Sequence, residues 1–120
     1  MSLDLEHLTR NGPSLNIGYR SFAEYRRLLA RDAAAINLDE MRGFGGERDW
    51  PDNEVQPLGY LLRHSDAEGW LHQCECESLR PVMVAFRPPL TWPSWASDYH
   101  GQLTTMIGNC ADEGGVIRFH

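Results

Sequence analysis

Apolar and polar residues alternate near both ends of the chain, which is typical of β-strands. Residues 3–8 and 15–19 alternate on either side of the turn-forming residues 11–14, and this arrangement predicts a hairpin. Residues 116–119 form a second apolar cluster that predicts a closing strand paired with the first one. We therefore expect a small sheet of two or three strands, made by the N-terminal strands and the C-terminal strand.

Between these ends, apolar residues recur at helical spacing in three segments. These segments are residues 22–35, 73–86 and 94–112. Ser21 and Glu24 have the spacing of a capping box that would start the first helix. Pro81 should kink or split the second helix. In the third helix the apolar stripe includes Trp95 and Tyr99. The pattern predicts an α+β fold, a mostly helical single domain over residues 1–120 with a small sheet.

The length of 120 residues is close to the commonest domain size, so we expect one globular domain. No apolar run approaches the ~18 residues of a membrane span, and the first residues lack the basic and apolar regions of a signal peptide. We therefore expect a cytoplasmic protein without a membrane partner.

The cysteines and several histidines are expected to be structural. Cys76 and Cys110 fall on apolar helix positions and are predicted to be buried, and the three cysteines show no disulfide-framework spacing. His7, His100 and His120 have no partner that the sequence identifies, so we expect them at the surface or at helix caps.

The negative charge of the chain is concentrated in its middle third. Residues 39–77 contain ten acidic residues against three arginines, a net charge of −7, whereas the whole chain carries −6. A field of this sign opposes nucleic-acid phosphates and attracts a cation or a basic protein surface. We therefore expect a protein partner and no nucleic acid, with an ordinary solvated face as the alternative.

One segment, residues 64–75, partly matches the twelve-residue calcium loop of an EF-hand. Gly69 falls at the sixth position, where the loop turns sharply, and carboxylates fall at the third, fifth and twelfth positions. The candidate metal ligands are Asp66, Glu68, Glu75 and His64. The match is partial because an imidazole occupies the first position, where a hard ion prefers an oxygen ligand. This pattern predicts a divalent cation, Ca²⁺ before others, or else no cofactor.

Other interpretations of the same segment remain open. It could be a structural turn in which Asp66 caps and Gly69 adopts a positive φ. A zinc site could use His64, His72, Cys74 and Cys76, although their spacing matches no standard zinc motif. A small hydrolase could use His64 as the base and Asp66 as its orienting group, with Ser65 or water as the nucleophile.

Several short motifs resemble a family of small uncharacterised bacterial and phage proteins. The resemblance covers residues 19–119 and rests on Tyr19-Arg20-Ser21-Phe22, Gly43-Phe44-Gly45-Gly46, Trp50, Pro57-Leu58, Leu61-Leu62-Arg63-His64-Ser65-Asp66, Glu68-Gly69, Leu71, Cys76, Met106, Cys110, Gly114 or Gly115, and Phe119. The hallmark of that family runs His-Ser-Asp-Cys-Asp-Gly, followed by a further Cys. This chain has Ala67 and Glu68 in place of the hallmark Cys and second Asp. The resemblance implies one coherent domain and implies no reaction.

The leading hypothesis is a non-enzymatic protein-binding module or inhibitor that uses an acidic central surface. A phage or mobile-element origin would fit an inhibitor directed at a host protein. The residues expected to contact the partner are Asp49, Trp50, Asp52, Glu54 and Trp70. Tryptophan is a common anchor of protein interfaces. A divalent-cation-binding domain and a small hydrolase are the alternatives.

Overall fold

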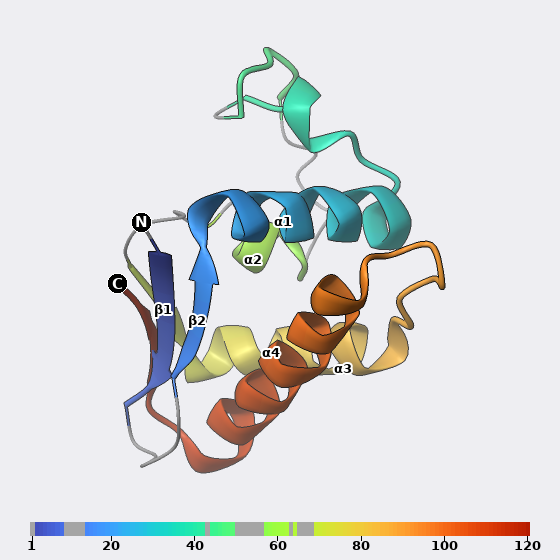
Figure 1. The fold of residues 1–120 in the computed structure, drawn as a ribbon. Coiled ribbons are helices and arrows are strands. Elements are labelled where there is room, and N and C mark those ends of the chain that lie inside the picture. The colour runs from blue at the N-terminus through green and yellow to red at the C-terminus, as the bar shows by residue number, and fades with distance from the viewer. Residues whose placement is uncertain (1, 9–13, 43, 50–56, 63, 65–68) are drawn as a thin grey trace.

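The strands at the two ends of the chain form one antiparallel sheet. The computed structural model describes residues 2–8, 14–42, 44–49, 57–62, 64 and 69–120. Strand β1 (Ser2–His7) pairs with β2 (Leu15–Gly18) on one side and with β4 (Val116–Phe119) on the other (Figure 1). Strand β3 (Gly69–His72) pairs with β4, so the strand order is β2-β1-β4-β3.

The predicted α+β class with a small sheet is confirmed, and the sheet has one strand more than the two or three expected. The additional strand, β3, lies inside the segment that was expected to be a loop. Its residues alternate as the sheet requires, because Leu71 is fully buried and Trp70 is 47% exposed. Four residues, of which the first is a glycine, are too few for this alternation to be recognised from the sequence.

The helices lie on one side of the sheet, and the other side faces solvent (Figure 1). They are α1 (Tyr19–Ala34), the 3₁₀ helix η1 (Leu38–Glu40), α2 (Gly59–Leu62), α3 (Gln73–Ala85) and α4 (Ser94–Glu113). Apolar residues of the sheet and helices share one core. Phe22 of α1 meets Phe119 of β4 edge to face at 6.1 Å and is itself fully buried.

Helix α1 begins earlier than the sequence predicted, and the predicted capping box of Ser21 and Glu24 is wrong. The chain passes directly from β2 into the helix, with Gly18 in an extended conformation as the N-cap. Ser21 therefore lies inside the helix, and Glu24 instead forms an ion pair with Arg27. A capping interaction of this kind occurs at α3, where the backbone N–H of His72 donates to Glu75 Oε1 at 3.0 Å.

Pro81 does not divide its helix, because α3 runs without interruption from Gln73 to Ala85. A proline removes one backbone N–H, so the carbonyl four residues earlier loses its helical donor. Pro81 and Glu77 both lie on the exposed face of α3. Water can therefore solvate the carbonyl of Glu77, and this position tolerates proline.

The predicted burial of Cys76 and Cys110 is confirmed, since both are fully buried. The expectation of a surface or capping role holds for His7, which donates from Nε2 to the carbonyl oxygen of Gly114, the C-cap of α4, at 2.8 Å. His100 is 4% exposed and so does not lie at the surface, but its Nε2 donates to the carbonyl oxygen of Met83 in the last turn of α3, which is a capping contact.

Candidate functional site

The segment that resembles a calcium loop is only partly described. Asp66 and Glu68, two of its four candidate ligands, lie outside the described residues. The side chain of His64 is hydrogen-bonded to the sheet, since its Nε2 donates to the carbonyl oxygen of Trp70 at 3.0 Å. Its ring also stacks on Phe119 with the ring centroids 3.8 Å apart. These contacts attach the start of the segment to β3 and β4.

Gly69 has two reasons to be glycine. Its φ of +115° lies in a region that other residues rarely adopt. A Cβ atom at this position would lie 2.9 Å from Cε1 of His64, closer than real Cβ contacts. The predicted positive φ at Gly69 is therefore confirmed, and the glycine also allows the His64 ring to cross the strand.

Arg26 of α1 holds the same segment from the other side. Its guanidinium is buried and donates from Nη1 to the carbonyl oxygens of Leu62 and His64. It also lies over the rings of Phe22 and Phe44, at 4.7 and 5.2 Å from their centroids. A fixed positive charge at the entrance to the segment opposes the approach of a cation.

The zinc grouping suggested by the sequence does not form. Its four members, His64, His72, Cys74 and Cys76, are all described, and no three His, Cys, Asp or Glu side chains of the described residues come together in a way that could hold a metal ion. Cys76 is fully buried in the core whereas Cys74 is exposed. The two side chains leave α3 on different sides, as their separation by two residues requires.

The acidic surface proposed for a partner is described in part. Trp50, Asp52 and Glu54 lie outside the described residues. Asp49 is exposed and pairs with Arg42 at 2.8 Å. Trp70 is exposed on the open face of the sheet, where Arg118 of the adjacent strand lies over its ring at 5.6 Å. The side chains of Asp49 and Trp70 therefore both have partners within the chain.

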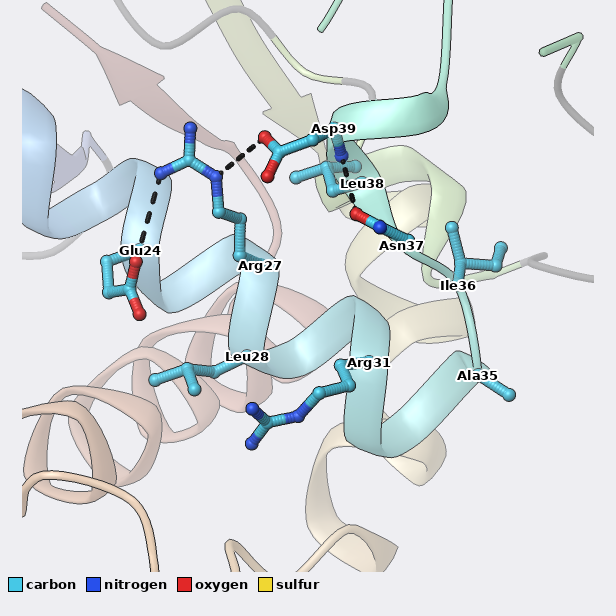
Figure 2. A pocket seen from close by; sticks show the side chains of 9 residues that line it. All are labelled: Glu24, Arg27, Leu28, Arg31, Ala35, Ile36, Asn37, Leu38 and Asp39. Carbon is cyan, nitrogen blue, oxygen red and sulfur yellow. Dashed lines mark hydrogen bonds and ion pairs between the residues drawn. The ribbon is translucent and has the colours of Figure 1, made fainter. Parts of the chain in front are cut away.

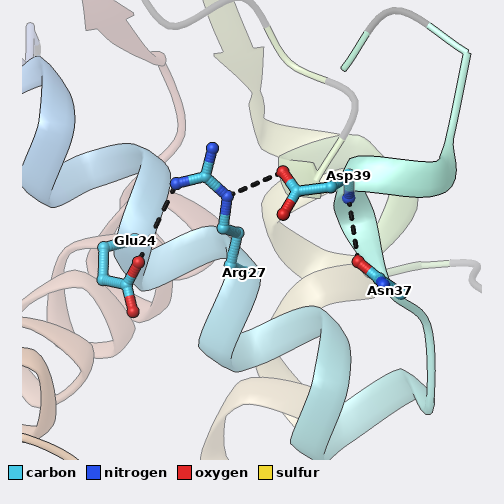
Figure 3. Close-up of polar contacts among 4 residues, drawn as sticks. All are labelled: Glu24, Arg27, Asn37 and Asp39. Atoms are coloured by element: carbon cyan, nitrogen blue, oxygen red, sulfur yellow. Dashed lines mark hydrogen bonds and ion pairs between the residues drawn. The ribbon is translucent and has the colours of Figure 1, made fainter. Parts of the chain in front are cut away.

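A pocket of about 510 Å³ lies between the second half of α1 and the segment that leads into η1 (Figure 2). Its apolar wall consists of Leu28, Ile36 and Leu38. Arg27 crosses its rim and donates from Nε to Asp39 Oδ1 at 2.9 Å, with Glu24 at 3.8 Å on the other side (Figure 3).

The remaining charge of this pocket is paired as well. Arg31 forms two hydrogen bonds to Asp32, at 2.8 and 2.9 Å. Trp92 donates from Nε1 to the same carboxylate at 2.6 Å. These hydrogen bonds, first that from Arg31 and then that from Trp92, lower the pKa of Asp32. Because Arg27 and Arg31 already pair with carboxylates of the same chain, they have little remaining charge to attract a ligand into this pocket.

A second groove, of about 380 Å³, lies beside the edge strand β2. Its lining residues are Asn16 and Ile17 of β2, Ser21 of α1, and Trp95, Asp98, Tyr99 and Gln102 of α4. The four helical residues are spaced i, i+3, i+4 and i+7, so they share one face of α4. We call this groove, defined by these seven residues, the β2–α4 groove.

The polar groups that α4 contributes to the β2–α4 groove have no hydrogen bond or ion pair within the described part of the chain, although the ring of Tyr99 packs edge to face on Phe22 and Tyr25. Trp95 is 39% exposed and contacts neither another ring nor a cation there. Asp98 is exposed and forms no ion pair with a described residue. Tyr99 is 5% exposed, and its hydroxyl makes no hydrogen bond to a described residue. Burial raises the pKa of Tyr99. Asp98 is the one carboxylate among the seven lining residues.

Backbone N–H and C=O groups of β2 also point outward at the edge of the sheet that this strand forms. Asp4 of β1 exchanges both of its backbone hydrogen bonds with His120, at 2.9 Å each, on the side away from β2. In an antiparallel ladder the paired residues alternate between these two sides. Asn16, which lies opposite Asp4, therefore points its N–H and C=O away from β1 at the outer edge of the sheet.

No family model, curated protein or solved structure that was compared with the chain matches it. The resemblance to proteins with a His-Ser-Asp-Cys-Asp-Gly loop therefore stays a prediction. Among the described residues, no helix combines the length and the apolar character needed to cross a bilayer.

The sequence did contain a signal for the β2–α4 groove, but it was assigned to the core. Trp95 and Tyr99 were expected in the apolar stripe of the last helix. That expectation is confirmed for Tyr99 and wrong for Trp95, which is partly exposed. Asp98 and Gln102 lie on the same helical face as Trp95. A face that mixes tryptophan with unpaired polar residues indicates a surface that something else could cover.

Proposed function

We propose that the protein is a non-enzymatic peptide-binding module. Its ligand is an extended segment of a protein partner, taken into the β2–α4 groove. The observation that carries this proposal is the combination of an edge strand with a groove that α4 lines along one face. An extended peptide that adds to a sheet edge gains main-chain hydrogen bonds, and adjacent pockets select its side chains.

The chemistry of the β2–α4 groove favours a peptide over a reacting small molecule. Asn16 presents a backbone donor and acceptor at the edge, which is what a further strand needs. Trp95 supplies a large, partly exposed ring, and such rings are frequent anchors of protein interfaces. The pocket beside η1 is less suited to this role, because Arg27 and Arg31 are already bound by carboxylates of the same chain.

The acidic middle third has a different part in this proposal from the one the sequence suggested. The net charge of −7 over residues 39–77 creates a field that steers a basic partner toward the domain. Direct contact by Trp70 is less favoured, since the guanidinium of Arg118 already lies over one face of its ring. The field therefore affects the rate of association, and the β2–α4 groove supplies the contacts.

A phage-displayed library of short linear peptides, selected on the immobilised full chain, tests this function. The expected result is a set of peptides whose binding is lost in Asn16→Pro, which removes the outward N–H. Proline is tolerated on edge strands when its missing N–H faces outward. Asn16→Ala is the matched control, because it removes the same side chain, with its hydrogen bonds to Asp4 and Ser2, and keeps the backbone donor.

Two further measurements make the result decisive. The first is near-ultraviolet circular dichroism, in which Asn16→Pro should retain the spectrum of the native packing. The second is peptide binding by Trp70→Ala, which should equal that of the wild type. Peptides that bind Asn16→Pro and the wild type equally would overturn the proposal. So would peptides that depend on Trp70 and are indifferent to Asn16, because they would place the contact on the open face of the sheet.

A further inference from the structure

We infer that the β2–α4 groove selects an arginine side chain of its partner, with the guanidinium stacked on Trp95 and hydrogen-bonded to Asp98. This inference rests on the proposed function and names the chemical class that the groove recognises. The two residues are three apart on α4 and line the same groove, so a single planar cation can contact both.

The first argument is that the other described tryptophans already have partners within the chain. Trp92 is buried and its Nε1 donates to Asp32 at 2.6 Å. Trp70 has the guanidinium of Arg118 over its ring at 5.6 Å. Among the described tryptophans, Trp95 is the one whose exposed ring has no such contact within the described residues. The chain therefore already contains an arginine–tryptophan pair of the kind that a partner would complete at Trp95.

The second argument is charge. Asp98 carries the charge of the β2–α4 groove, whereas the carboxylates beside the other pocket, Glu24, Asp32 and Asp39, each lie next to an arginine of the chain. An aromatic face beside an unpaired carboxylate attracts a cation through both the ring quadrupole and the negative charge. The rest of the lining is uncharged at neutral pH, so within the lining a cationic side chain meets no competing positive charge.

Arginine fits this pair of residues better than lysine. Its planar guanidinium stacks on an indole and presents several N–H donors in a fixed geometry, so it can contact a ring and a carboxylate at once. Gln102 lines the same groove, and its side-chain oxygen can accept one of the remaining donors. Lysine has a compact charge without a planar face, and it would use the indole and the carboxylate less completely.

The test is a nuclear magnetic resonance titration of the full chain with N-acetyl-arginine amide. We expect saturable shifts confined to the amides and side chains of the β2–α4 groove. N-acetyl-citrulline amide, which has an uncharged side chain of the same shape as arginine, should bind about tenfold more weakly or not measurably. The affinity of N-acetyl-lysine amide should lie between those of the arginine and citrulline compounds. The variants Trp95→Ala and Asp98→Asn should each weaken arginine binding about tenfold.

Asp112→Asn is the matched control, since Asp112 is an exposed carboxylate of the same helix that pairs with Arg80 outside the groove. It should leave arginine binding unchanged. Equal binding of arginine and citrulline, or shifts that Asp98→Asn leaves in place, would overturn the inference.

If selected peptides bind in a manner sensitive to Asn16→Pro but without dependence on Asp98, the peptide-binding function stands and the arginine preference fails. If arginine binds here but no peptide depends on Asn16, the groove is a cation site and strand addition fails.

Discussion

The hydroxyl of Tyr25 donates a hydrogen bond to Nδ1 of His100 at 2.8 Å, and both side chains are buried. The other ring nitrogen of His100, Nε2, lies 3.1 Å from the carbonyl oxygen of Met83. A carbonyl oxygen can only accept, so Nε2 carries the proton and Nδ1 is free to accept from Tyr25. One histidine on α4 therefore joins α1 to α3 through the interior of the helical layer.

Removing the Tyr25 hydroxyl should destabilise the domain. The variant Tyr25→Phe leaves Nδ1 of His100 buried without its donor, and we expect a loss of about 1–3 kcal/mol in the free energy of unfolding. Urea denaturation followed by circular dichroism measures this difference. Tyr99→Phe is the matched control, because the Tyr99 hydroxyl has no hydrogen-bond partner among the described residues and its removal should cost little. Equal losses in the two variants would contradict this account of the Tyr25–His100 pair.

The stability of the domain should depend on the protonation of His100. Burial lowers the pKa of His100 below its ordinary value, although its hydrogen bond to the Met83 carbonyl works in the opposite direction. The unfolded chain therefore takes up a proton at a higher pH than the folded chain does. Stability is complete above about pH 6.5 and decreases as the pH falls below that value, by at most about 1.4 kcal/mol per pH unit.

Urea denaturation at a series of pH values from neutral to mildly acidic measures this dependence. His100→Gln lacks a titrating group at this position and should show a smaller decrease over the same interval. If the variant and the wild type lose stability in parallel, the acid sensitivity belongs to other groups.

Much of the fold followed from local patterns. The hairpin and the closing strand were predicted from alternation, and the helices α3 and α4 from apolar spacing. Errors arose where tertiary contacts override a local signal. Ser21 has the spacing of an N-cap, yet β2 leads directly into α1 and places it inside the helix. The strand β3 forms because β4 offers an edge to pair with, which a four-residue segment does not reveal by itself.

The candidate site was harder to predict for a similar reason. The β2–α4 groove joins residues separated by about eighty positions in the sequence, and only the folded chain brings Asn16 beside Gln102. The sequence predicts Trp95 in the core because it falls on the apolar stripe of the last helix. Whether such a ring is buried or exposed depends on what packs above it. That information lies in the arrangement of β2 and α4 and is absent from the helical pattern.

Replacing Gly69 with alanine should destabilise the domain. The alanine would have to adopt a φ near +115°, and its Cβ would meet the ring of His64 at 2.9 Å. We expect a loss of more than about 1 kcal/mol, measured by thermal or urea denaturation. Gly101→Ala is the matched control, because Gly101 lies within α4 and a Cβ there meets no atom within 4 Å. That variant should gain about 0.5–1 kcal/mol through its better helix propensity. A neutral Gly69→Ala would show that the His64 ring moves aside without cost.

Arg26 should contribute much more to stability than its neighbour Arg27. Arg26→Met keeps a long apolar stem but leaves the carbonyls of Leu62 and His64 without their buried donor. We expect a loss of about 2–3 kcal/mol in the free energy of unfolding. Arg27→Met removes an exposed ion pair with Asp39 and should cost less than about 1 kcal/mol. Comparable losses in both variants would mean that the buried carbonyls find other donors when Arg26 is removed.

The structure argues against the calcium site that the sequence suggests in residues 64–75, next to the buried guanidinium of Arg26. A cation in the segment 64–75 would need Glu75 as its ligand at the twelfth position, whereas Glu75 accepts a hydrogen bond from the N–H of His72 that caps α3. The buried guanidinium of Arg26 adds a positive charge at the carbonyl of His64, the first position of the loop. Both features disfavour a divalent ion. Calorimetric titration of chelator-stripped protein with Ca²⁺, Mg²⁺ or Zn²⁺ should therefore show no saturable heat.

The variant Glu75→Gln should lower the unfolding temperature equally with and without Ca²⁺, because what it loses is the carboxylate that caps α3. Saturable binding that disappears in Asp66→Ala would reverse this expectation and would make the segment an ion site.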